Sequence, residues 1–138
     1  MTIDALEGSL IVSCQAEADS PFRSTEFICA FARAAVAQGA RALRLEGLAD
    51  VRAVRAREQV PIIGIVKRRV REVFITPTVQ DAHDLCDAGA DIVAFDATHR
   101  ARAVSPNWCR PCRPAGKSPW PTFPPWPKGS RRLMRVPT

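Results

Sequence analysis

The chain has 138 residues, which is one domain at most and too few for a complete (β/α)8 barrel, a fold of about 250 residues. Its formal net charge is +6, but acidic residues outnumber basic ones 14 to 11 up to Thr98, and 9 basic residues with no acidic residue follow. The positive charge therefore belongs to the last part of the chain, so it does not indicate nucleic-acid binding by the first part.

The N-terminus lacks the basic and apolar regions of a secretory signal, and no apolar run approaches the roughly 18 residues of a membrane span. The cysteines are scattered along the chain and number 5, so they form no even set for a disulfide framework. These features predict a cytoplasmic protein without membrane contact, in a reducing compartment.

The first predicted elements are a strand, a helix and a second strand. Ser9–Cys14 is a continuous apolar run, typical of a strand buried on both faces. Ser24 suits the N-cap of a following helix, and Gly39 suits the position just after its end. Ala42–Leu45 is the second strand. The residues predicted to form the apolar face of the helix are Phe27, Ile28, Phe31, Ala35 and Val36.

The middle of the chain contains the strongest predicted strand. Asp50–Glu58 precedes it and spaces Val51 and Val54 three residues apart, as on one side of a helix. Val60–Val66 is then almost wholly apolar, and Pro61 lies at its start, where a missing N–H group is tolerated.

The last predicted elements are a capped helix and a fourth strand. Thr78 and Asp81 form a variant capping box, and Gly89 ends the helix that follows. Asp91–Phe95 is the fourth strand. The apolar residues of this helix are Val79, Ala82, Leu85 and Cys86. The order of elements is therefore βαβαβαβ.

Repeated βα units require parallel strands with right-handed crossovers, as in a doubly wound sheet or a barrel. A dinucleotide-binding sheet would carry GxGxxG after its first strand, whereas this chain reads SCQAEADSPF there. The predicted fold class is thus α/β, a partial (β/α)8 TIM barrel comprising the first four βα units in residues 1–98. Residues 99–138 are rich in Pro, Arg and Trp and are predicted to form an irregular or disordered tail outside that fold.

In both folds the residues that carry chemistry follow the carboxyl ends of the strands. Lys67 is the most informative of them, because the run IIGIV leads directly to it and the environment of a barrel mouth can tune an amine into a base. The alternative is that Lys67, Arg68 and Arg69 begin a solvated basic loop. The polar residues at these strand ends are Gln15, Arg44, Glu46, Lys67, Arg68, Asp96 and Thr98.

Arg44 lies within an otherwise apolar strand, so its side chain must face a cavity or extend to solvent. A guanidinium group in a cavity suits an anionic or hydroxyl-rich ligand. The sequence therefore favours a ligand-contacting role for Arg44.

Four segments, in order along the first 98 residues, resemble bacterial N-acetylmannosamine-6-phosphate 2-epimerases. The strings SCQA, GIVKR and ITPT within them are specific to that family rather than general to barrels. The four segments are LEGSLIVSCQA (6–16), VPIIGIVKR (60–68), VFITPT (73–78) and AGADIVAFDAT (88–98).

The resemblance implies that Lys67 is the catalytic lysine and that Gln15 and Arg44 contact substrate; Asp96, after the fourth strand, is assigned with them. Family members convert N-acetylmannosamine 6-phosphate to its glucosamine epimer by removing and returning the proton beside the sugar carbonyl. The expected partner is thus a phosphorylated N-acetylhexosamine, with no cofactor, no metal and no nucleic acid. The open strand edges are expected to make the chain aggregate, associate into a homodimer, or persist as a partly ordered half-barrel.

The chain departs from the family pattern in two places. The segment KRRVREVF (67–74) is shorter than its family counterpart and lacks acidic loop residues. In addition, the family's MAD(I/V) strand, late catalytic glutamate and C-terminal phosphate-binding loops have no counterpart in the chain. These departures leave a second hypothesis open, that of an inactive truncated product with at most residual sugar-phosphate binding.

A change of reading frame near Ala101 is the predicted origin of the tail. Permitted synonymous codons for Ser118–Thr138, read in a shifted frame, can spell VAMADISTLAEGLAALDAGAD, which contains the missing MADIS strand. This origin also accounts for a Cys109/Cys112 CxxC pair that lacks a second ligand pair for zinc, and for a basic, Trp-containing composition typical of nucleic-acid binding. A nucleic-acid-binding tail remains a third hypothesis, which requires salt-sensitive binding by the tail alone.

Overall fold

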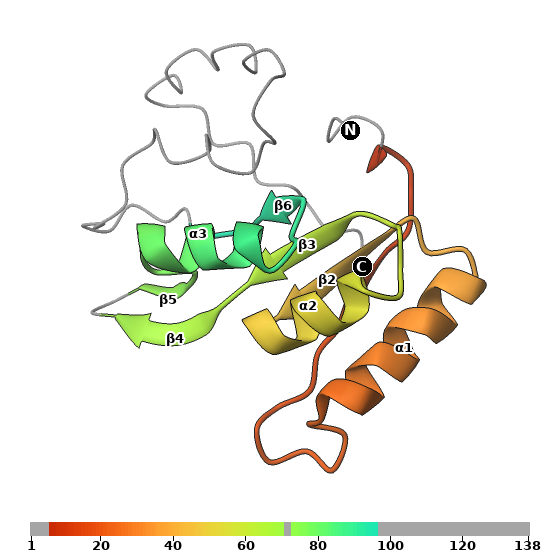
Figure 1. Ribbon diagram of the computed structural model, residues 1–138, viewed down its shortest axis with the longest axis horizontal. Coiled ribbons are helices and arrows are strands. Elements are labelled where there is room, and N and C mark those ends of the chain that lie inside the picture. The colour runs from red at the N-terminus through yellow and green to blue at the C-terminus, as the bar shows by residue number, and fades with distance from the viewer. Residues whose placement is uncertain (1–5, 71–72, 97–138) are drawn as a thin grey trace, which may run out of the picture.

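The computed structural model describes residues 6–70 and 73–96, and Figure 1 shows how their elements are arranged. The elements are β1 (Ile11–Cys14), α1 (Thr25–Ala37), β2 (Ala42–Glu46), α2 (Leu48–Arg55), β3 (Ile62–Ile65), β4 (Lys67–Val70), β5 (Val73–Ile75), α3 (Val79–Asp87) and β6 (Ile92–Val93). The predicted boundary near residue 98 and the predicted tail lie outside these ranges.

The main sheet has four parallel strands in the order β1-β2-β3-β6. The register aligns Ser13 with Arg44, and Arg44 with Ile63. Each connection between neighbouring strands contains a helix, and right-handed crossovers in this order place all three helices on one side of the sheet (Figure 1). The predicted α/β fold, a parallel sheet whose strands are joined through helices, is thereby confirmed.

Local capping explains where the helices begin and end. The Ser24 side chain accepts a hydrogen bond from the Phe27 N–H at 3.3 Å, which satisfies one of the free donors at the start of α1. Thr78 and Asp81 form the predicted capping box of α3. Gly39 and Gly89 adopt φ angles of 96° and 103° just after α1 and α3, a conformation that glycine adopts without strain.

The hydrophobic core lies between the three helices and the sheet. Its buried members from the strands are Cys14, Leu43, Leu45 and Ile62, and those from the helices include Ile28, Cys29, Ala32, Val51, Val54 and Leu85. The predicted apolar face of α1 is only partly buried, since Phe27 and Phe31 are 45% and 39% exposed. Because α1 has apolar residues around most of its circumference, spacing alone did not show which side would meet the sheet.

Two strands that the sequence did not predict form an antiparallel hairpin beside the main sheet. In it β4 pairs with β5, with Lys67 opposite Ile75 and Val70 opposite Val73. Consecutive basic residues are unusual in a strand, and periodicity gives no signal for one here. The hairpin therefore replaces the solvated basic loop that was the alternative for Lys67, Arg68 and Arg69.

Gly64 in β3 is required by the close packing of α3. A Cβ atom at position 64 would lie 2.9 Å from Leu85 Cδ2 and 2.9 Å from Ala90 Cβ, closer than carbon atoms approach. We expect Gly64→Ala to lower the free energy of unfolding by about 1–3 kcal/mol, the usual cost of overpacking a core. Urea unfolding measures this change, and a variant as stable as the wild type would show that α3 packs less closely than described.

None of the helices within the described ranges is long and apolar enough to cross a membrane.

Candidate active site

The two faces of the main sheet have different roles. Cys14, Leu45 and Ile62 contact the helices, and burial raises the pKa of the Cys14 thiol, so this residue remains a neutral core group. Because side chains alternate along a strand, Arg44 and Glu46 lie on the opposite face, which no helix of residues 6–70 and 73–96 covers. That face is the interior side of a barrel, and the candidate residues gather at the carboxyl end of its strands.

Lys67 lies at this carboxyl end and is held by carboxylates. Its Nζ atom is 3.0 Å from Glu46 Oε2 and 3.8 Å from Glu17 Oε1. The Lys67 and Glu46 side chains are only 20% and 16% exposed, whereas Glu17 is 83% exposed. The charged groups beside Lys67 in the described residues are therefore carboxylates.

Arg44 lies two residues before Glu46 in β2 and therefore on the same face of the sheet. Its side chain is partly buried, and across the part of the chain that the structure describes its guanidinium group has neither an ion-pair nor a hydrogen-bond partner. A guanidinium group has five N–H donors, and partners for them stabilise it when it is withdrawn from water. Arg44 is therefore available to an oxygen-rich or anionic ligand, as the sequence indicated.

Gln15 directly follows β1, and its position relative to β2 is set by the pairing of Cys14 with Leu45. Its Nε2 atom donates to Ser13 Oγ at 2.6 Å, which leaves the amide oxygen of Gln15 without a partner among residues 6–70 and 73–96. The structure thus places Gln15 at the same end of the sheet as Glu46 and Lys67. No contact joins Gln15 to either of them within those residues.

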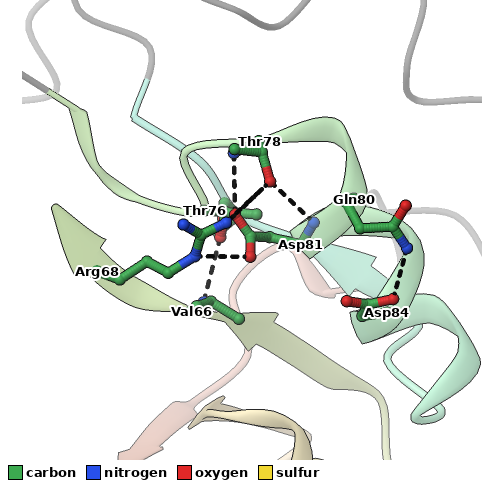
Figure 2. A network of polar contacts seen from close by, with 8 residues as sticks. Val66, Arg68, Thr76, Thr78, Gln80, Asp81 and Asp84 are labelled. Atoms are coloured by element: carbon green, nitrogen blue, oxygen red, sulfur yellow. Dashed lines mark hydrogen bonds and ion pairs between the residues drawn. The ribbon is translucent and has the colours of Figure 1, made fainter. Parts of the chain in front are cut away.

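Asp96 reaches this end of the sheet through the hairpin. Its N–H group donates to the Ile75 carbonyl at 3.1 Å. The preceding residues are fixed by Thr76, whose hydroxyl donates to the Ala94 carbonyl at 2.7 Å and accepts from the Val66 N–H at 3.3 Å (Figure 2). Thr76 therefore links the residue before Lys67 to the segment that leads to Asp96.

Thr76 adopts an unusual backbone conformation while it makes these contacts. It is buried and has a φ angle of 45°, although a threonine before a proline strongly prefers extended backbone. Such a conformation costs on the order of 1–3 kcal/mol and tends to occur at functional sites. The hydrogen bonds on both sides of Thr76 stabilise the conformation in this fold.

Arg68 and Arg69 do not share the location of Lys67. Arg68 turns toward the start of α3, where its Nε and Nη2 atoms lie 3.0 Å and 2.9 Å from the two oxygens of Asp81 (Figure 2). Arg69 lies over the Phe74 ring, with its guanidinium carbon 6.0 Å from the ring centre. Of the three consecutive basic residues, only Lys67 is directed to the candidate site.

A cavity of about 280 Å³ lies beside Glu46, at the starts of α1 and α2. Asp50 closes its far wall by accepting hydrogen bonds from Arg23 Nη1 at 3.0 Å and from Thr25 Oγ1 at 2.6 Å. These bonds fix the loop between β1 and α1, which carries Glu17. The residues lining the cavity are Arg23, Ser24, Thr25, Glu46, Gly47, Leu48, Ala49 and Asp50.

Glu17, Glu46 and Thr76 are residues of this site to which sequence reasoning gave no role, although Glu46 was named at a strand end. Glu46 had a usable signal, since it follows Arg44 by two residues and so shares its face of the strand. Thr76 had none apart from its place in the string ITPT. In the described ranges no three histidine, cysteine or acidic side chains come together as a metal site.

Comparison with known proteins places the chain among amino-sugar phosphate epimerases. A sequence model of the family described as "Putative N-acetylmannosamine-6-phosphate epimerase" matches residues 28–109. A relative from Edwardsiella ictaluri with the same description, as a 2-epimerase, is 54% identical over 97 residues, which are 69% of this chain and 41% of that protein. A relative from Salmonella typhimurium is 50% identical over 99 residues, which are 70% of this chain and 44% of that protein.

The structure gives the same result. The solved N-acetylmannosamine-6-phosphate 2-epimerase of Clostridium perfringens is similar with a TM-score of 0.69 and 38% sequence identity, over 73% of this chain and 45% of that chain. The chain thus spans less than half the length of these relatives.

Proposed function

Since the chain belongs to the N-acetylmannosamine-6-phosphate epimerase family, we propose that its site binds N-acetylmannosamine 6-phosphate and that Lys67 transfers the proton in its epimerisation. Gln15, Arg44 and Asp96 contact the sugar in this proposal. No cofactor or metal takes part in it, and the cytoplasm is the proposed location.

The observation that carries the proposal is that two cationic groups with different surroundings lie on one face of the sheet. The Lys67 ammonium group is held by Glu46 at 3.0 Å, whereas the Arg44 guanidinium group has no partner within the described ranges. A site for a phosphorylated sugar needs both a group that exchanges a proton and donors for sugar oxygens.

The chemistry follows from these positions. Removing the proton from the carbon beside the sugar carbonyl places negative charge on the carbonyl oxygen, and a nearby guanidinium group stabilises that charge. The neutral amine of Lys67 takes the proton. Return of a proton to the opposite face of the same carbon then inverts its configuration, and this step needs an acid on that face.

We expect Arg44→Ala to weaken binding of N-acetylmannosamine 6-phosphate to the chain at least about tenfold, since charge-assisted hydrogen bonds each contribute roughly 1.5–3 kcal/mol. Ligand-observed NMR titration detects weak binding and suits this measurement. Arg41→Ala is the matched control, because Arg41 is exposed at the opposite end of β2 and should leave binding unchanged. Equal affinities for the wild type and both variants would contradict the proposed role of Arg44.

A homodimer is a further part of the proposal, and α1 offers a surface for it. Phe22 contacts Phe27 and Phe31 edge to face, with ring centres 5.5 Å and 5.9 Å apart, and all three rings are exposed. Ala30 and Ala34 lie on the same exposed side of α1. An antiparallel helix pair related by a twofold axis would place Phe27 against the partner's Ala34 and Phe31 against the partner's Ala30, so that large residues meet small ones.

The dimer is tested by placing a charge in this cluster. We expect Phe31→Glu to lower the weight-average mass toward that of a monomer. The substitution should raise the dissociation constant of the dimer at least about tenfold. Sedimentation equilibrium at several protein concentrations measures this change. Phe74→Glu is the control, since Phe74 is similarly exposed but belongs to β5. A dimer unaffected by Phe31→Glu would show that other surfaces, such as the strand edges, hold it.

The second candidate is an inactive product of a shifted reading frame, and the composition of residues 99–138 favours it. This segment holds 9 of the 12 prolines and all 3 tryptophans. In this reading the chain has at most residual sugar-phosphate binding. Sequencing the locus around the codon of Ala101 distinguishes the two candidates, because insertion or deletion of a single base there would restore the family strand MADIS downstream.

A further inference from the structure

Glu46 is the closest charged neighbour of the proposed base. It extends from the end of β2, and its Oε2 atom lies 3.0 Å from Lys67 Nζ, which comes from the start of β4. The other charged group facing Lys67 in the described residues is Glu17, from the loop after β1, at 3.8 Å. The two carboxylates differ greatly in exposure, since Glu46 is 16% exposed and Glu17 is 83% exposed.

These differences give the two carboxylates unequal influence on Lys67. Solvent screens Glu17 almost completely, whereas the attraction between Glu46 and Lys67 acts through a partly buried environment. The contact also restricts the Lys67 side chain to one position at the end of the sheet.

We propose that Glu46 is the positioning residue of Lys67: its carboxylate holds the Lys67 amine at the sugar site. The inference rests on the proposed function for the use of that amine on a sugar. Across the 3.0 Å contact a proton can pass from the ammonium group to the carboxylate, which gives a neutral amine and a carboxylic acid with no other reactant. A ligand hydroxyl that donates to Glu46 would instead weaken its hold on Lys67.

The test uses acylation of the amine, because only the neutral form of lysine reacts. Lys67 is the single lysine of residues 1–98, so peptide mass spectrometry follows it without ambiguity after brief treatment of the whole chain with an acetylating ester. We expect Glu46→Gln to raise the acetylation rate of Lys67 at pH 7 about fivefold. Glu17→Gln is the matched control and should change that rate less than about twofold.

The pH profile separates this role from loosened packing. If the Glu46 carboxylate holds the ammonium group, the ratio of variant to wild-type rates falls toward one as the pH rises, because the neutral amine forms no ion pair in either protein. A ratio that stays constant with pH would mean that Glu46→Gln only increases access to Lys67, and that result would overturn the inference. Equal rates in the wild type and Glu46→Gln, or equal increases in both glutamate variants, would overturn it as well.

Added N-acetylmannosamine 6-phosphate tests the proposed function in the same samples. Protection of wild-type Lys67 from acetylation is the expected result, because the bound sugar covers the amine. Absence of protection would contradict the proposed function while leaving the Glu46 result to be judged by the rates alone. Circular dichroism of each variant checks that the fold is retained.

Discussion

Asp81→Ala is expected to lower the free energy of unfolding by about 2–4 kcal/mol. The buried carboxylate of Asp81 accepts hydrogen bonds from Arg68 Nε at 3.0 Å, from the Thr78 N–H at 3.0 Å and from the Thr78 hydroxyl at 2.6 Å (Figure 2). Loss of an N-terminal helix cap alone costs about 1 kcal/mol, and charge-assisted hydrogen bonds add to it.

The same helix offers the control for this prediction. Asp84 lies three residues after Asp81, but in the hydrogen bonds of the described chain its side chain accepts only from Gln80 Nε2, at 2.8 Å on the surface (Figure 2). Asp84→Ala should therefore change stability by less than about 0.5 kcal/mol. Urea unfolding of the two variants gives the comparison, and equal losses of stability would mean that Asp81 is not the residue that joins the hairpin to α3.

The sequence predicted the elements whose signals are local. Ser24 and the Thr78–Asp81 pair begin helices because their side chains bond to nearby N–H groups, and Gly39 and Gly89 end helices because of their backbone freedom. The four main strands followed from their apolar runs, although the structure shortens the fourth to Ile92–Val93. Lys67 could be predicted at the candidate site because it directly follows a buried apolar strand, and the strands of a parallel sheet have their carboxyl ends at the same edge.

Features that depend on distant partners could not be predicted in this way. Arg68 lies in a strand because β4 pairs with β5, and its side chain bonds to Asp81, 13 residues further on. Phe31 points away from the sheet because the smaller residues of α1 pack against the sheet. Thr76 adopts its positive φ angle because Val66 and Ala94 form hydrogen bonds with its side chain. Each of these outcomes requires a contact that sequence periodicity does not contain.

The second large effect concerns the proposed base. We expect restoration of the reading frame near Ala101 to give a longer protein that interconverts the two N-acetylhexosamine 6-phosphates. In that protein Lys67→Ala should lower turnover about 10²–10⁴-fold, the usual contribution of a positioned acid or base. Arg69→Ala is the matched control, since Arg69 is two residues away on the same strand but lies over Phe74, and it should retain turnover close to that of the parent protein.

Proton exchange tests the central claim most directly, because it reports the bond-breaking step rather than the overall reaction. The measurement is the incorporation of solvent deuterium at the carbon beside the sugar carbonyl, followed by NMR, in the frame-restored protein and its Lys67→Ala variant. We expect incorporation in the former and none above background in the latter. Retention of deuterium exchange after Lys67→Ala would remove Lys67 from the proton transfer and contradict the assignment of this site.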